Sequence, residues 1–254
     1  MTPEFGKPRT AIVTGGARRI GAAIVRALLD DGWHLLVHCR DSCDEIDLSS
    51  AADGRIRVVS ADLAEGDAAE RVFAALAGMP PPALLVNNAS RFVYDTLDDF
   101  DPAAWEAHFA ANLRAPALLT QAFARAVPAG AGGLIVNLLD AKLAQPNPDY
   151  FTYTLSKMGL AGLTELAARA LAARGIRVCG IAPSVTLVSG PQSRENFDAV
   201  HRLNALGRGV EVDQVVAALR FLIATPVLTG QTIVLDGGQR FLSLPRDVQF
   251  MVTE

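Results

Sequence analysis

The sequence predicts an α/β fold built on one doubly wound sheet of about seven parallel strands, with helices on both faces. Short apolar runs alternate along the chain with longer segments of helical periodicity. Most of these runs are continuously apolar, as expected of strands that helices cover on both sides. Half of the 254 residues are hydrophobic, which is enough for one large core, so we expect residues 1–254 to form a single domain of Rossmann-like architecture.

The strands are predicted at seven apolar runs: Thr10–Thr14, Leu35–His38, Ile56–Ser60, Leu84–Asn87, Leu134–Leu138, Ile176–Ile181 and Thr232–Leu235. Helical periodicity predicts helices at Ile20–Asp31, Ala68–Ala77, Pro102–Val127, Tyr153–Arg174 and Val212–Ala224. The third helix has a start signal, because Asp101 supplies an N-cap oxygen and Pro102 has no N–H to leave unpaired. The crossover Asp41–Arg55 is rich in Asp, Ser and Gly, and we expect a poor helix or none there.

Composition argues against several classes of partner. A formal net charge of -4 gives no general attraction to a polyanion, so neither nucleic acid nor an acidic membrane surface is expected. The three cysteines form no C-x-x-C pair and join no histidine cluster, which predicts no metal site and a reduced, cytoplasmic setting. Residues 1–9 lack the apolar stretch of a signal peptide, and no run approaches the roughly 18 apolar residues of a membrane span.

A glycine-containing turn follows the first predicted strand. Residues 14–21 have the sequence T-G-G-A-R-R-I-G and stand directly before a predicted helix. Glycines let the backbone approach a pyrophosphate closely, and the free N–H groups of a helix N-terminus bind it. The turn predicts a dinucleotide site that includes Gly15, Arg18, Arg19 and Ile20. A strand-to-helix turn without a ligand is the alternative.

The end of the second predicted strand bears on the choice of cofactor. Residues 38–40, H-C-R, lack the carboxylate that would hydrogen-bond the 2'-hydroxyl of NAD. Arg40 and Arg18 would instead clamp a 2'-phosphate through charge-assisted bonds, which predicts NADP(H). Asp41 and Asp44 leave NAD(H) open, because a shift of one residue would bring a carboxylate to the ribose.

Tyr153 and Lys157 are the predicted catalytic pair. Their i, i+4 spacing places a phenol and an ammonium on one helical face. We expect the ammonium to lower the pKa of the phenol, so that Tyr153 exchanges a proton near neutral pH. The sequence holds only three tyrosines and three lysines, which makes this spacing uncommon by chance. The alternative is a core aromatic residue beside a surface lysine.

With these motifs the chain resembles the short-chain dehydrogenase/reductase family from about Arg9 to Arg240. The matching pieces are the Thr14-Gly15 turn, Asp62-Leu63, Asn87-Asn88-Ala89, Asn112, Tyr153 with Lys157, Ala182-Pro183 and Asp236-Gly237-Gly238. The resemblance implies hydride transfer from a nicotinamide, with Tyr153 as the proton donor and Lys157 holding the nicotinamide ribose. It also implies that Asn112 anchors a proton-relay water, and that the enzyme is a homotetramer.

Further cofactor contacts complete this expectation. The resemblance implies that Asp62 and Leu63 contact the adenine, and that Asn88 and Ala89 line the ribose side. We also assign cofactor contacts to His38, Ser90, Pro183, Ser184 and Thr186.

Three positions depart from the common pattern of the family. Arg19 replaces a glycine of the turn, Ser90 replaces the glycine after Asn-Asn-Ala, and Asp140 stands 13 residues before Tyr153, where the family has a serine. Together with Phe92, these residues resemble the pteridine reductase and dihydromonapterin reductase branch. An ionised carboxylate accepts hydrogen bonds but cannot donate them, so Asp140 suits a substrate that has N–H donors or is protonated at nitrogen.

The predicted function is therefore NADPH-dependent reduction of a dihydropteridine, whose hydride acceptor is a C=N bond. Predicted substrate contacts are Arg19, Ser90, Phe92, Asp140 and Tyr153. A generic carbonyl or imine reductase for another small molecule is the first alternative, and a non-catalytic NADP(H)-sensing module is the second. Residues 184–209 are expected to form a substrate lid that is helical in its middle, and no role follows for the tail 241–254.

Overall fold

The computed structural model describes residues 5–41, 54–189 and 192–251. Within them, seven parallel strands form one sheet in the order β3-β2-β1-β4-β5-β6-β7. The chain leaves β3 on one side of β1 and returns to β4 on the other, which creates the switch point where doubly wound folds bind ligands. The strands are β1 Thr10–Thr14, β2 His34–Cys39, β3 Ile56–Ser60, β4 Pro82–Asn87, β5 Gly133–Leu138, β6 Ile176–Pro183 and β7 Thr232–Leu235.

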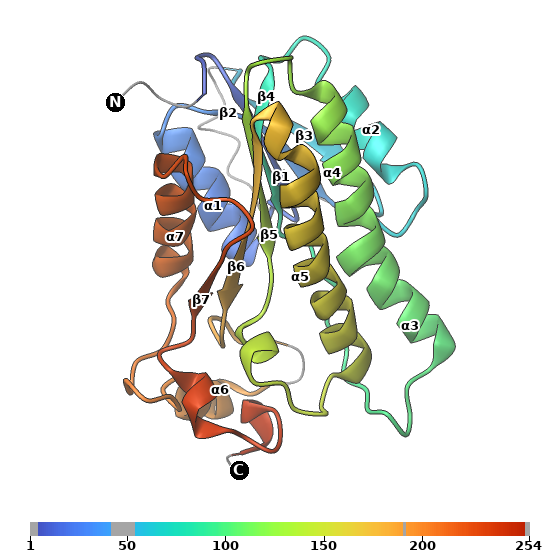
Figure 1. Ribbon diagram of the computed structural model, residues 1–254. Helices are drawn as coiled ribbons and strands as arrows, with labels where there is room; N and C mark the ends of the chain where they lie inside the picture. The colour runs from blue at the N-terminus through green and yellow to red at the C-terminus, as the bar shows by residue number, and fades with distance from the viewer. Residues whose placement is uncertain (1–4, 42–53, 190–191, 252–254) are drawn as a thin grey trace.

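Helices cover both faces of the sheet (Figure 1). One core joins α1 and α7 to the sheet through side chains such as Leu28 and Leu219, and the other joins α2, α4 and α5 through Val72, Phe123 and Ala168. This arrangement explains the continuously apolar strands, because both of their faces lie against helices. The helices are α1 Arg19–Asp30, α2 Ala68–Ala74, α3 Pro102–Phe109, α4 Ala115–Ala126, α5 Phe151–Leu171, α6 Arg194–Val200 and α7 Val212–Ala224.

The predicted fold class is confirmed, and each predicted strand lies within two residues of an observed one. The long helix predicted at Pro102–Val127 is wrong as a single helix, because a π-helical turn, η2 Ala110–Arg114, separates α3 from α4. Such a turn inserts a residue and redirects the side chains that follow, and it is frequent at functional sites. Most of the predicted non-helical crossover, residues 42–53, lies outside the described residues.

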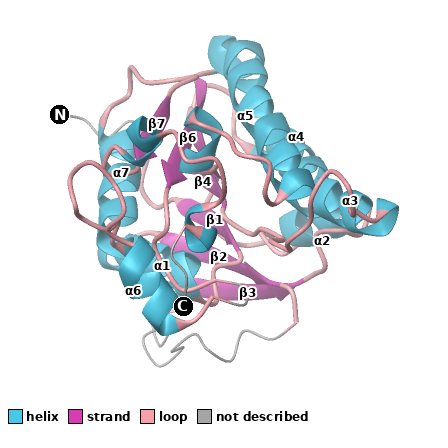
Figure 2. Cartoon of the chain, turned by 90° about the horizontal axis from the view of Figure 1, so that it is seen from below, coloured by secondary structure: helices cyan, strands magenta, loops and turns pink. Residues whose placement is uncertain are grey.

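The carboxyl ends of the strands face the lower side of Figure 1, where α6 and the C-terminal segment also lie. Figure 2 shows this side toward the viewer. The predicted lid region contains α6, in agreement with the helix expected in its middle. In the parts of the chain that the structure describes, no helix is long and apolar enough to cross a membrane, and no group of three or more His, Cys, Asp or Glu side chains is placed to hold a metal ion.

Candidate active site

A cavity of about 1040 Å³ lies at the carboxyl ends of the strands. We name its two parts by the residues that line them. The cofactor half includes lining residues from 15–21, 38–41, 62–64 and 88–89, and the substrate half includes lining residues from 90–93, 138–147, 153–157, 184–192 and 236–249. Every residue that the sequence assigned to the cofactor or the substrate lines this cavity, whereas Asn112, assigned to catalysis, lies behind it.

The turn between β1 and α1 brings its backbone close to residues 88 and 89. Gly15 has a φ of +61°, and a Cβ there would lie 3.1 Å from the Cα of Ala89. A Cβ on Gly21 would lie 2.1 Å from the carbonyl oxygen of Gly15, so no larger residue fits at the start of the helix. The free N–H groups of α1 therefore face an open cradle of the kind that binds a pyrophosphate.

Polar side chains beneath the turn hold it in place. The Asn88 amide donates to the carbonyl oxygens of Thr14 and Gly15 at 2.9 and 3.1 Å. The Thr14 hydroxyl accepts from the backbone N–H groups of Asn88 and Ala89, both at 3.0 Å. Asn88 thus supports the turn in addition to lining the predicted ribose side.

His38 supports the same turn from the end of β2. Its Nδ1 accepts from the Gly15 N–H at 3.3 Å, and its Nε2 lies 2.8 Å from the carbonyl oxygen of Ala61. The imidazole is buried, and burial lowers the pKa of His38. A neutral ring with its proton on Nε2 satisfies both contacts.

Arg40 and Arg18 are exposed at the rim of the cofactor half. The Arg40 guanidinium pairs with Asp41 at 3.0 Å, so in this structure the neighbouring carboxylate is held by the arginine. At the end of β3, the Asp62 carboxylate accepts from the Ala64 N–H at 2.9 Å and Leu63 is buried. These residues surround a site that could hold a 2'-phosphate, while Asp44 lies outside the described residues.

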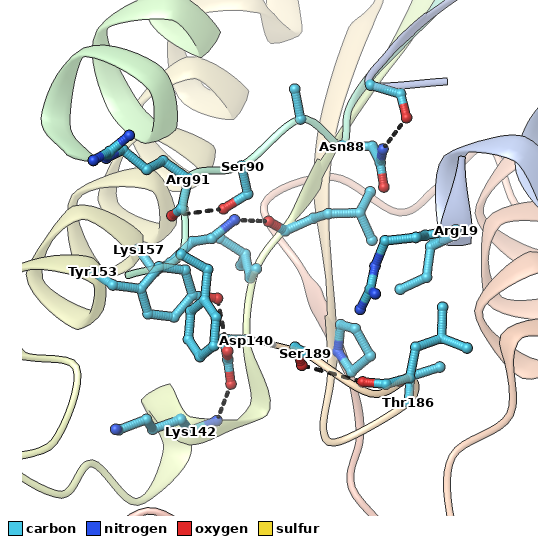
Figure 3. Close-up of a pocket in the computed structure, with 18 of the residues that line it drawn as sticks. Arg19, Asn88, Ser90, Arg91, Asp140, Lys142, Tyr153, Lys157, Thr186 and Ser189 are labelled. Carbon is cyan, nitrogen blue, oxygen red and sulfur yellow. Dashed lines mark hydrogen bonds between the residues drawn. The ribbon is translucent and has the colours of Figure 1, made fainter. Parts of the chain in front are cut away.

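Asp140, Tyr153 and Lys157 meet in the substrate half (Figure 3). Asp140 follows β5, and the other two residues share one face near the start of α5. The Tyr153 Oη donates to the Asp140 Oδ2 at 2.8 Å. The Asp140 Oδ1 accepts from the Lys142 backbone N–H at 2.8 Å, which orients the carboxyl group. The Lys157 Nζ donates to the carbonyl oxygen of Leu138 at 2.7 Å.

Burial changes the proton affinities of all three groups. It raises the pKa of Asp140, because the charged carboxylate is removed from water. It lowers the pKa of Lys157 to about 8 for the same reason. Burial and the Asp140 carboxylate raise the pKa of Tyr153 well above 10.0. The expectation that Lys157 lowers the phenol pKa is therefore wrong for this arrangement, in which the ammonium binds a backbone carbonyl instead.

Asn112 lies on the π-helical turn and fixes the segment that enters the substrate half. Its amide donates to the Ser156 hydroxyl and to the Arg91 carbonyl oxygen, each at 2.9 Å. Its Oδ1 accepts from the Arg91 N–H at 2.8 Å and from the Ser90 hydroxyl at 3.1 Å. The side chain therefore ties Ser90 to α5, and its predicted role in anchoring a water stays a prediction.

Phe92 and Arg19 approach the cavity from opposite sides. The Phe92 ring stacks on Tyr150, with centroids 4.2 Å apart, and meets Tyr153 edge-on at 4.7 Å. The Arg19 guanidinium donates to the Val188 carbonyl oxygen at 2.7 Å, across the cavity from its own turn. Both residues lie where a flat ring could contact them.

The segment after β6 closes the side between the two halves. Its lining residues include Pro183, Ser184 and Thr186. The Ser184 N–H donates to the Leu235 carbonyl oxygen at 2.8 Å, and the buried Thr186 hydroxyl donates to the Ser184 carbonyl oxygen at 2.8 Å. These bonds fix the course of the segment that carries the predicted cofactor contacts Ser184 and Thr186.

Comparison with known proteins agrees with this geometry. Residues 9–198 match the short chain dehydrogenase family. The chain belongs to this family. Relatives include L-xylulose reductase of Mesocricetus auratus, 33% identical with 91% of this chain and 96% of the relative covered, and D-erythrulose reductase of Gallus gallus, 30% identical with 94% and 98% covered.

Two crystal structures of FolM alternative dihydrofolate reductase 1 in complex with NADP are also similar to this short-chain dehydrogenase. The Brucella suis protein is 41% identical with a TM-score of 0.87, covering 91% of this chain and 95% of the other. The Brucella canis protein is 40% identical with a TM-score of 0.88, covering 95% and 97%. At this level of identity over nearly the whole chain, the likeness extends to the sequence and is not limited to the fold.

The departure at Arg19 has a backbone consequence. Arg19 has a φ of +56°, the left-handed conformation that a glycine adopts freely. For a residue with a Cβ this conformation costs on the order of 1 kcal/mol. A short-chain dehydrogenase that keeps the conformation with an arginine gains a guanidinium directed into the cavity (Figure 3).

The C-terminal part of the lining was not predicted from the sequence. Residues of the tail, among them Leu244, Asp247 and Gln249, line the substrate half. No spacing or composition signal marks them, because the segment 243–251 contains a single short helix, η6 Val248–Phe250. Only its contacts with Lys142 and Asp149 reveal where it lies.

Proposed function

We propose that this short-chain dehydrogenase is an NADPH-dependent reductase of a dihydropteridine such as a dihydropterin or dihydromonapterin. The observation that carries the proposal is the 2.8 Å hydrogen bond from the Tyr153 phenol to the partly buried Asp140 carboxyl. As the acceptor of the Tyr153 hydroxyl, the Asp140 carboxylate would repel the oxyanion that forms during ketone reduction. The same carboxylate would attract a ring nitrogen that becomes protonated during C=N reduction, and its raised pKa lets it relay that proton.

The residues of the cofactor half fit NADPH. Gly15 and Gly21 leave the space that a pyrophosphate needs, and Arg18 with Arg40 offers guanidinium groups for a 2'-phosphate. When bound, NADPH supplies the hydride. The NADP in the FolM crystal structures supports this assignment.

The proposed function gives separate roles to the residues in and around the substrate half. Asp140 accepts hydrogen bonds from the pteridine or passes a proton to its ring nitrogen, and Tyr153 shares that proton through their hydrogen bond. Lys157 orients the nicotinamide ribose, and Phe92 offers an aromatic face to the ring. Asn112 holds Ser90 and the chain that leads to Phe92. Arg19 lies near enough to both halves to contact phosphate and substrate.

Carbonyl reduction is the second candidate function. L-xylulose reductase and D-erythrulose reductase are similar to this chain over nearly its whole length, and their names describe the reduction of sugar ketones. The FolM proteins share more identity with the chain, and Asp140 disfavours an oxyanion, so we place the dihydropteridine first. The resemblance to the family also supports a homotetramer, which light scattering of the purified protein tests.

A substitution at Asp140 separates the two candidates. NADPH oxidation is measured with dihydromonapterin and with a panel of ketones, for the unmodified protein and for Asp140→Ser. We expect dihydromonapterin turnover to fall by about 10²-fold, the scale of acid–base assistance. Ketone turnover should hold or rise, because a serine hydroxyl donates to an oxyanion.

Asp213→Ser is the matched control, since Asp213 is exposed on α7 and does not line the cavity. Thermal unfolding shows whether each variant is folded. Unchanged dihydromonapterin turnover in Asp140→Ser, or a preference of the unmodified protein for ketones over every pterin, would show that the dihydropteridine assignment is wrong.

A further inference from the structure

The C-terminal residues 243–251, which we name the strap, lie at the lower end of the molecule in Figure 1, on the same side as α6, and this side faces the viewer in Figure 2. Leu244, Asp247, Val248 and Gln249 line the cavity together with Asp140 and Tyr153. The strap follows β7 and is more than 90 residues from Tyr153 in the chain. Its position therefore depends on tertiary contacts alone.

A buried carboxylate anchors the strap. The Asp149 side chain is 3% exposed and accepts from the Arg246 Nε at 2.7 Å and from the Asp247 backbone N–H at 2.7 Å. These bonds hold the pKa of Asp149 below its usual value, although burial alone would raise it. Asp149 lies directly before the helix that carries Tyr153, so the anchor connects the strap to the catalytic helix.

Lys142 and Asn196 make two further contacts with the strap. The Lys142 Nζ donates to the Asp149 carbonyl oxygen and lies 3.3 Å from the Asp247 Oδ2. The Asn196 amide, on α6, donates to the Gln249 carbonyl oxygen at 2.9 Å. The strap thus joins the turn after Asp140, the start of α5 and the helix of the lid region.

Asp247 has acceptor capacity that the protein does not use. One carboxylate oxygen meets Lys142 at 3.3 Å and the other accepts from the Gln249 N–H at 3.3 Å, both near the long limit of a hydrogen bond. Each oxygen of a carboxylate can accept about two hydrogen bonds, so lone pairs remain on both. Asn147 lines the same cavity, and its Oδ1 is buried and has no hydrogen-bond partner.

Two of the cations that line this half, Lys142 and Arg240, are already paired with carboxylates. Lys142 is paired with Asp247, and Arg240 is paired with Asp236 at 2.8 Å. Burial raises the pKa of Asp140 and the Asp247 carboxylate adds to this rise, whereas the hydrogen bonds from the Lys142 N–H and the Tyr153 hydroxyl lower it. The substrate half therefore offers acceptor oxygens on Asp140, Asp247 and Asn147.

We propose that Asp247 is a specificity-determining residue, whose carboxylate accepts hydrogen bonds from N–H donors of the substrate, and that the anchored strap holds it in that position. The inference rests on the proposed function, because a dihydropteridine carries an amino group and ring N–H groups. It extends the predicted substrate contacts to a segment for which the sequence indicated no role.

The test compares full-length variants with dihydromonapterin as the probe. Asp247→Asn keeps the size of the side chain and one acceptor oxygen but removes the charge. The loss of a charge-assisted hydrogen bond is expected to raise KM by about 10-fold. The Kd for NADPH should not change, because Asp247 does not line the cofactor half. The pH profile of kcat should move to lower pH, because the Asp247 charge is among the causes that raise the pKa of Asp140.

A second variant tests the anchor. Arg246→Gln removes the ion pair with Asp149 at a half-exposed position and leaves the lining residues in place, so the protein should fold. We expect a smaller KM rise of about threefold, because the Asp247 side chain itself is kept. Asp213→Asn, an exposed acid on α7, is the matched control and should match the unmodified protein.

The outcomes separate this inference from the proposed function. If the unmodified protein reduces dihydromonapterin and Asp247→Asn behaves like Asp213→Asn, the inference about Asp247 is wrong and the proposed dihydropteridine reduction is unaffected. An equal loss of NADPH affinity in Asp247→Asn would show a structural role and would also overturn the inference. If the unmodified protein neither binds nor reduces dihydromonapterin, both proposals fail.

Discussion

The cofactor half and the substrate half of the cavity are held by different kinds of contact. In the cofactor half, glycines bring backbone segments together and Thr14, Asn88 and His38 bond to backbone atoms. In the substrate half, ionisable side chains bond to one another, as Tyr153 does to Asp140, and the buried Asp149 binds the half-exposed Arg246 beside it. The first half is thus shaped mainly by the course of the chain, and the second mainly by charge and burial.

This difference teaches where each half is sensitive. A backbone cradle tolerates changes in exposed side chains, because its donors are N–H groups that every residue except proline carries. Removal of an ionisable side chain from a buried pair is costly, because the remaining partner is then left without a hydrogen bond or an opposite charge. Substitutions of Asp140, Tyr153 and Lys157 should therefore have large effects on turnover, whereas substitutions in the cofactor half should have graded effects on affinity.

The largest effect is expected for Lys157→Ala. Lys157 is 3% exposed, lines the cavity and binds the Leu138 carbonyl oxygen, so its loss removes both an ammonium and a positioning bond. We expect turnover to fall by about 10³-fold or more, with weaker NADPH binding, measured by NADPH oxidation and by fluorescence titration. Lys7→Ala, at an exposed position, is the control. Normal turnover would exclude this half as the catalytic centre.

The next prediction concerns the pH dependence of stability. Burial lowers the pKa of Lys157 to about 8 from 10.5, so between these values the unfolded chain binds more protons than the folded protein. The free energy of unfolding contributed by Lys157 therefore rises with pH through this window, and the full penalty is present below it. At about 1.4 kcal/mol per pKa unit, the penalty is about 3 kcal/mol.

Lys157→Met fills the same space without the charge and should escape this dependence. The stability of Lys157→Met relative to the unmodified protein is expected to be greatest near neutral pH and to decline as the pH rises above about 8. Urea unfolding of both proteins at a series of pH values measures the difference. A difference that does not vary with pH would mean that Lys157 is not desolvated in the folded protein.

The smallest effect is expected in the cofactor half. Arg40 is exposed and pairs with Asp41, so Arg40→Asp should leave the fold and kcat nearly unchanged. NADPH binding should weaken by about 10-fold and NADH binding should not, because a carboxylate there would face only a 2'-phosphate. Fluorescence titration with both cofactors measures this, with Arg26→Asp on the outer side of α1 as the control. Equal affinity of the unmodified protein for NADPH and NADH would show that Arg40 does not select the 2'-phosphate.

Much of the fold followed from local patterns. The strands β1, β3 and β7 begin and end at the predicted residues, because apolar runs bounded by polar or glycine residues mark buried strands well. The π-helical turn at Ala110–Arg114 was missed, since helical periodicity is nearly the same on both sides of it. The strap was missed because its position depends on Asp149 and Lys142, which are about 100 residues away in the chain.

The sequence by itself determined the order of strands and helices along the chain, the glycine turn, the spacing of Tyr153 and Lys157, and the departure at Asp140. Each of these depends on neighbours within a few residues, so periodicity and spacing contain the information. Only the tertiary structure decided which partner Lys157 takes, in which direction the Tyr153 pKa moves, and that Asp247 reaches the cavity. Those properties depend on burial and on which distant segments meet, and neither is written in any local stretch of the chain.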